Sequence, residues 1–125
     1  MPRSVTIAIA QTLRVFPGDT ESERKAANLA ALGIYAAEAA AAGADIICFS
    51  ENFNLFWAPP DGTPAPELLD NEWTATAAGL AAEHGIYIIL PGRFVHEGIR
   101  RNAALLFDAA GEIQGWYFKS HLTRT

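Results

Sequence analysis

Blocks of apolar residues, separated by polar turns, predict two helices and five strands along the chain. Residues 4–11 are rich in β-forming side chains, and the turn sequence at residues 16–19 ends this first predicted strand. A helix is predicted next, because Leu and Ala recur at near-helical spacing until Gly43. Asp19 or Thr20 can cap this helix, which defines where it starts.

The middle of the chain contains a short strand, a long loop and a second helix. The continuous apolar run from Asp45 to Phe49 is typical of a strand that is covered on both faces. Residues 53–70 hold four prolines and show little periodicity, which indicates a loop. Asn71 can cap an Ala-rich helix that runs to His84 and is ended by Gly85.

Three further strands are predicted in the last third of the chain. They cover residues 86–95, 102–108 and 113–118, with turns at residues 96–98 and 109–111. The predicted order is therefore β-α-β-α-β-β-β, which is an α/β fold.

Connectivity alone predicts where two charged residues lie. Strands joined by helices run parallel and each hairpin reverses the direction, so the fifth strand should run parallel to the second. Glu51 follows the second strand and Lys119 follows the fifth. We therefore expect both residues on one rim of the sheet, which is where open α/β sheets bind ligands.

Composition narrows the class of protein. The chain has 125 residues, half of them hydrophobic, which describes one soluble globular domain spanning residues 1–125. A net charge of −5 and only two lysines exclude the basic surface that nucleic acid or anionic lipid requires. The sequence shows no secretory signal and no stretch that would span a membrane, so we expect a cytoplasmic protein.

Glu51 and Lys119 are the candidate catalytic residues. Glu51 leaves an apolar strand at a mouth of the sheet, where partial desolvation would raise its pKa towards values that suit a general base. The alternative is an acid that marks the point where a strand meets solvent. Lys119 follows three aromatic residues and could either stabilise an oxyanion or extend past apolar surface to water. Together they supply two of the three parts that acyl transfer needs.

The third part, a nucleophile, is missing. Cys48 is the only cysteine, and it lies within an apolar strand, where burial raises the pKa of the thiol and favours a structural role. Ser50 has no histidine placed to activate it. In the loop that follows, Phe53 and Trp57 are candidate substrate-binding residues, although aromatics there can also cover the edge of the sheet.

Neither a metal nor another cofactor is expected. The three histidines are scattered and lack partners at ligand spacing. The first strand is not followed by the glycines of a phosphate-binding loop, and the P-loop motif does not occur. These observations argue against a nucleotide-binding module.

Five sequence blocks resemble those of the nitrilase superfamily of carbon–nitrogen hydrolases. The blocks are VTIAIAQ at residues 5–11, GADIICFSENF at 43–53, RNAALLFD at 101–108, GEI at 111–113 and YFKSHL at 117–122. Their order and spacing over essentially the whole chain carry the resemblance. Two departures are Ser50, where a proline usually precedes the glutamate, and Phe118, where an arginine often precedes the lysine.

The resemblance implies an α-β-β-α sandwich with a Glu-Lys-Cys triad, of which this chain covers the first half. Glu51 matches the general base and Lys119 the residue that stabilises the oxyanion. In the family the nucleophilic cysteine lies downstream of the lysine block, so we expect the chain to be a partial domain that stops before the nucleophile. The implied reaction is hydrolysis of a nitrile, an amide or a carbamoyl amine, and the 125 residues alone should be inactive.

Two functional hypotheses therefore follow from the sequence. The first is a part of a carbon–nitrogen hydrolase that acts on a small nitrile or amide and forms homo-oligomers. The alternative is a non-catalytic remnant that acts only by associating with other subunits. Half of a sandwich would expose an apolar sheet face, so both hypotheses predict self-association, aggregation or a completing partner.

Overall fold

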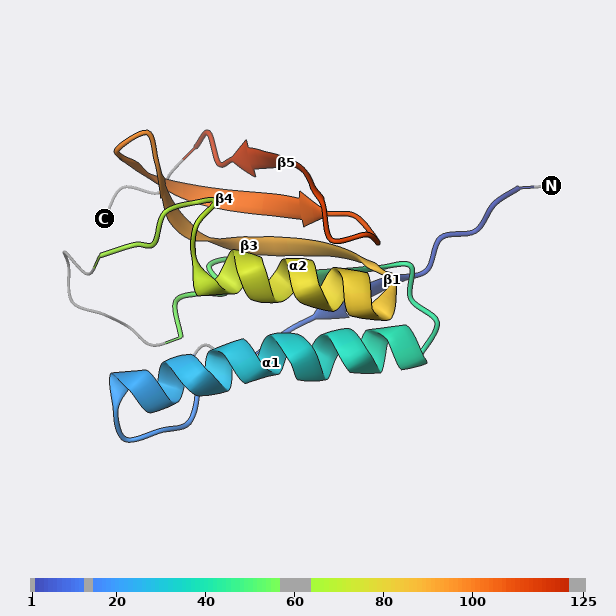
Figure 1. Cartoon of the computed structure of the whole chain (residues 1–125), viewed down its shortest axis with the longest axis horizontal. Coiled ribbons are helices and arrows are strands. Elements are labelled where there is room, and N and C mark those ends of the chain that lie inside the picture. The colour runs from blue at the N-terminus through green and yellow to red at the C-terminus, as the bar shows by residue number, and fades with distance from the viewer. Residues whose placement is uncertain (1, 13–14, 57–63, 122–125) are drawn as a thin grey trace.

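The described residues form two helices and a five-stranded sheet in the predicted order. The structure is a computed structural model, and it describes residues 2–12, 15–56 and 64–121. The elements are β1 (Ile7–Ala10), α1 (Glu21–Ala41), β2 (Ile46–Phe49), α2 (Glu72–His84), β3 (Tyr87–His96), β4 (Ile99–Phe107) and β5 (Ile113–Phe118). The strands lie side by side in sequence order, and β3, β4 and β5 can be followed in this order in Figure 1. The first three are parallel and the last two hairpin strands are antiparallel, which confirms the predicted α/β fold.

Local capping fixes the ends of both helices. Thr20 caps α1 through a reciprocal box, in which its hydroxyl accepts from the Glu23 N–H and the Glu23 carboxylate accepts from the Thr20 N–H. Asn71 caps α2, and Gly85 ends it in the left-handed conformation at φ 63°. Both caps of α2 are as the sequence predicts.

Both helices cover the same face of the sheet (Figure 1). The buried side chains of neighbouring strands lie next to one another on this face, because paired residues share a face of the sheet. One such row runs from Ile47 on β2 through Ile88 on β3 to Phe107 on β4, and all three side chains are buried. The hydrophobic core therefore lies between this face and the helices.

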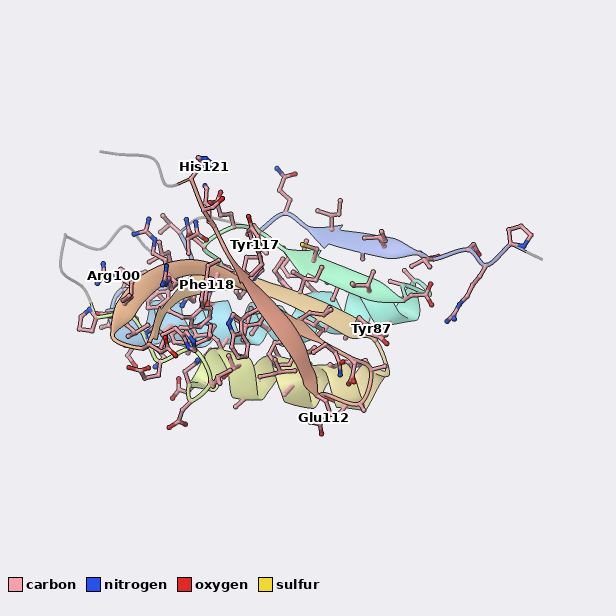
Figure 2. All side chains as sticks on the ribbon, turned by 90° about the horizontal axis from the view of Figure 1, so that it is seen from above. Tyr87, Arg100, Glu112, Tyr117, Phe118 and His121 are labelled. Atoms are coloured by element: carbon pink, nitrogen blue, oxygen red, sulfur yellow. The ribbon has the colours of Figure 1, made fainter. Side chains whose placement is uncertain are left out.

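The opposite face of the sheet, here called the open face, is covered by no helix of the described residues and remains partly exposed. The prediction that residues 45–49 are covered on both faces is therefore wrong: Ile47 and Phe49 are buried, whereas Ile46 and Cys48 are only half-buried. The strand has an apolar residue at every position, which hides the alternation from the sequence. Figure 2 looks down on the strands, with Tyr87 and Tyr117 labelled. The most exposed apolar side chains of the open face are those of Ile7, Ile9, Tyr87 and Tyr117.

The two hairpins differ from the prediction in detail. Strand β4 begins at Ile99, earlier than predicted, because Glu97 and Gly98 make a two-residue turn with positive φ and let His96 pair with Ile99. In the second hairpin, Leu106 pairs with Gly115 but Phe107 pairs with Ile113. Gln114 is thus an extra residue in β5, a β-bulge.

Candidate active site

The ends of β2 and β5 bring Glu51 and Lys119 together. Glu51 lies two residues beyond β2, and Lys119 directly follows β5. The Lys119 backbone N–H donates to the Asn102 carbonyl at 2.8 Å, which continues the β4–β5 ladder by one residue. Both residues lie on one rim of the sheet, as the count of strand reversals predicts, and Lys119 Nζ forms an ion pair with Glu51 Oε1 at 2.8 Å.

Asn102 is the third member of this cluster. Its Nδ2 donates to the same oxygen, Glu51 Oε1, at 2.9 Å. In the sequence, Asn102 belongs to the RNAALLFD block, but its contact with Glu51 is not predicted. The signal that could have found it is the hairpin register, because Asn102 faces Arg93 on β3 and lies beside Lys119.

The environment lowers the pKa of Glu51, so the prediction of a raised pKa is wrong. The largest causes are the hydrogen bonds from Lys119 and Asn102, followed by the positive charge of Lys119. The charge of Arg93 acts in the same direction, and burial opposes it only weakly because the Glu51 side chain is 58% exposed. Hydrogen bonds and a nearby cation favour the ionised carboxylate, so Glu51 is a carboxylate at neutral pH.

The loop that carries Glu51 is fastened to β3. Asn52 adopts a left-handed conformation at φ 56°, which turns the chain sharply after Glu51. The Asn54 side chain then pairs with the backbone of Arg93, donating to its carbonyl and accepting from its N–H, both at 2.7 Å. The Phe53 N–H donates to the Pro91 carbonyl at 3.1 Å. These bonds fix Glu51 relative to the central strand.

The other predicted residues lie in different surroundings. Phe53 is 3% exposed, and its ring contacts those of Phe16 and Phe49 in the core. These contacts favour a packing role, and substrate binding by Phe53 stays a prediction. Trp57 lies outside the described residues. Burial raises the pKa of the Cys48 thiol, in the predicted direction.

The arrangement offers a base and a cation but holds no cluster suited to a metal ion. Within residues 2–12, 15–56 and 64–121, no three His, Cys, Asp or Glu side chains gather as metal ligands. No helix among these residues is long and apolar enough to cross a membrane.

The chemistry that Glu51 and Lys119 offer is that of a base beside a cation. A carboxylate beside an ammonium group can accept a proton while the cation stabilises a developing negative charge.

Comparison with known proteins gives a family and a fold. The sequence model of the carbon–nitrogen hydrolases matches residues 6–125. No curated protein sequence matches the chain.

Several solved structures share the fold. A mutant of the Nesterenkonia AN1 amidase from the nitrilase superfamily is 26% identical, with a TM-score of 0.78, over 99% of this chain and 47% of its own. A double mutant of the amidase from Nesterenkonia sp. AN1 in complex with acrylamide is 23% identical, with a TM-score of 0.76. The match covers 100% of this chain and 47% of the amidase chain. A carbon–nitrogen hydrolase from Helicobacter pylori G27 is 19% identical, with a TM-score of 0.68. The match covers 95% of this chain and 40% of the hydrolase chain. The chain thus spans about half the length of these structures or less.

Proposed function

Because the chain belongs to the carbon–nitrogen hydrolase family, we propose that it supplies the general base and the oxyanion-binding cation for hydrolysis of an amide or a related carbon–nitrogen bond. The observation that carries this proposal is the 2.8 Å ion pair between Glu51 and Lys119 on the rim where the parallel strands end. The nucleophile in this proposal is a cysteine from outside the 125 residues. Cys48 is unsuited, because it lies within β2 and its pKa is raised.

The proposed reaction uses each group in turn. Glu51 accepts the proton of the external thiol, and the thiolate sulfur attacks the amide carbon. The carbonyl oxygen then becomes an oxyanion, which Lys119 stabilises. The carbon–nitrogen bond breaks as Glu51 returns the proton to the leaving amine, and a thioester remains. Glu51 next takes a proton from water as the water oxygen attacks the thioester carbon. The carbon–sulfur bond then breaks, and Glu51 gives this proton to the leaving sulfur, which releases the acid and restores the thiol and the carboxylate.

The occupancy of Glu51 Oε1 suggests which oxygen acts. Lys119 and Asn102 both donate to Oε1, so we assign the proton transfers to Oε2. A carboxylate held on one oxygen keeps the other in a fixed direction, which suits repeated proton transfer.

Ammonia release tests the proposal. The chain would be recovered by affinity tag from its native host, together with any polypeptide that accompanies it, and assayed with small aliphatic amides including acrylamide. Glu51→Gln and Lys119→Met should each lower kcat by about a hundredfold or more, since each removes a group that acts in the transition state.

Two controls make the result specific. Cys48→Ser should keep the activity, and so should Glu97→Gln, which removes an exposed acid from the β3–β4 turn. Loss of activity in Cys48→Ser, with thioester labelling at Cys48, would overturn the external nucleophile. Full activity in Glu51→Gln would overturn the proposal as a whole.

The alternative is a non-catalytic chain that acts through subunit association. The exposed apolar side chains of the open face favour it, since such surfaces mark association sites. A chain that is recovered with a partner but releases no ammonia from any amide, nitrile or carbamoyl amine would support this alternative.

A further inference from the structure

Asn102 touches both members of the candidate active site. We infer that Asn102 is a positioning residue, which holds Glu51 through its side-chain amide and Lys119 through its backbone carbonyl. The contribution of Asn102 to catalysis rests on the proposed function, whereas its effect on the orientation of the Glu51 side chain does not.

The side-chain contact fixes one oxygen of Glu51. Asn102 Nδ2 lies 2.9 Å from Glu51 Oε1, and Lys119 Nζ lies 2.8 Å from the same atom. Two donors on one oxygen restrict rotation of the carboxylate more than a single flexible lysine would. Glu51 begins a turn and its side chain is exposed, so core packing does little to orient it.

The backbone contact fixes Lys119 independently of the Asn102 side chain. Lys119 lies just past the last residue of β5, and its N–H donates to the Asn102 carbonyl at 2.8 Å. Asn102 itself lies within β4, opposite Arg93 of the central strand β3. A substitution of the Asn102 side chain should therefore loosen Glu51 and leave the backbone of Lys119 in place.

The chemistry of the position favours an amide. The charged groups that face Glu51 are Lys119, which touches it, and Arg93, which acts through its charge. An aspartate at position 102 would place a second carboxylate beside Glu51 and compete for Lys119. An aliphatic side chain would offer no donor to Oε1. Only a neutral donor supports Glu51 without disturbing the ion pair.

The pKa of Glu51 provides a readout that does not depend on activity. It would be measured by carbon-detected NMR titration of the side-chain carboxyl in the parent chain and in Asn102→Ala. We expect Asn102→Ala to raise the pKa, because a hydrogen bond to the ionised form is lost. Lys119→Met should raise it further, since Lys119 contributes both a hydrogen bond and a charge.

Gln114→Ala is the matched control. It also removes an amide that donates to a carboxylate, from Gln114 Nε2 to Asp108 Oδ2 at 2.6 Å, but at the opposite end of the same hairpin. This variant should leave the pKa of Glu51 unchanged. Asn102→Leu serves as a second variant of similar size, with neither a donor nor a charge, if Asn102→Ala fails to fold, and it should also raise the pKa of Glu51. An unchanged pKa in a folded Asn102 variant would overturn the inference.

Kinetics separate this inference from the proposed function. In the amide assay, Asn102→Ala should lower kcat by about tenfold with little change in KM, and Gln114→Ala should change neither. If Glu51→Gln and Lys119→Met abolish turnover while Asn102→Ala changes neither kcat nor the pKa of Glu51, the positioning role fails alone. If Glu51→Gln stays active but Asn102→Ala still raises that pKa, the proposed function fails alone.

Discussion

At the scale of single residues, Gly92 leaves room for the side chain that anchors the Glu51 loop. A Cβ on Gly92 would lie 2.6 Å from Phe94 Cε2 and 2.9 Å from Asn54 Oδ1. The Asn54 oxygen is the atom that accepts the Arg93 N–H. Because Gly92 has no side chain, the loop that carries Glu51 and Asn54 can approach the backbone of β3 closely at this position.

Gly92→Ala should therefore destabilise the protein by about 1–3 kcal/mol, the usual cost of forcing an extra carbon into a packed region. Urea unfolding followed by circular dichroism measures this change. Gly79→Ala is the control, because a Cβ there meets no atom within 4 Å and the residue lies within α2. That variant should be more stable than the parent chain by about 0.5–1 kcal/mol. Equal stability of the two variants would contradict the packing argument.

The sequence allows part of the candidate site to be predicted. The proximity of Glu51 and Lys119 follows from counting strand reversals, which needs no side-chain detail. The contact of Asn102 with Glu51 depends on the exact hairpin register and could not be read from the pattern. The direction of the Glu51 pKa could not be read either, because it reflects these two donors and not the apolar strand before it.

At the scale of elements, the capping box of α1 links helix stability to pH. The N–H groups of Asp19 and Thr20 donate to Glu23, at 2.7 Å and 3.1 Å, and these bonds lower the pKa of Glu23. The folded-state pKa thus lies below the unfolded value of about 4.3. The stabilisation is fully present above the unfolded pKa and is lost as the pH falls through the folded pKa.

Glu23→Gln should accordingly lower the melting temperature at pH 7 and have less effect near pH 3. Thermal unfolding at both pH values, followed by circular dichroism, measures the difference between the parent chain and the variant. Glu21→Gln is the control, since Glu21 lies in the same first turn outside the capping box. A difference between parent and Glu23→Gln that stays the same at both pH values would contradict a role for the charge.

Helix ends are the elements that the sequence predicts best. Asn71 and Gly85 act through local backbone geometry, which residue type largely determines. The coverage of β2 is predicted poorly, because its side chains are apolar on both faces and only tertiary packing distinguishes them. Among the described residues, one face of β2 is buried against the helices and the other is only half-buried.

At the scale of the whole molecule, the open face should govern association. Ile9 lies on β1 and is 80% exposed, and Tyr117 lies on β5 and is 66% exposed. Apolar side chains therefore remain accessible on both edge strands of the sheet. Such a surface favours contact with another polypeptide.

Ile9→Lys should shift the chain towards smaller species in size-exclusion chromatography with light scattering. The reason is that a charge on the open face opposes its burial against a second surface. Ile34→Lys is the matched control, because Ile34 is also exposed, at 58%, but lies on α1. A parent chain that is monomeric at all concentrations would contradict this prediction, as would equal effects of the two substitutions.

The extra residue in β5 decides which face of the sheet receives Lys119. Successive side chains along a strand point to opposite faces of the sheet. One residue more or less between β4 and β5 therefore moves every later side chain of β5 to the other face. Gln114 shifts that count by one, which brings Lys119 beside Asn102. Without the shift Lys119 would come opposite Arg101, whose guanidinium stacks on Phe118 at the helix-covered face. The number of residues between the Asn102 block and the Lys119 block therefore predicts the face of Lys119 only when the extra residue of the bulge is taken into account.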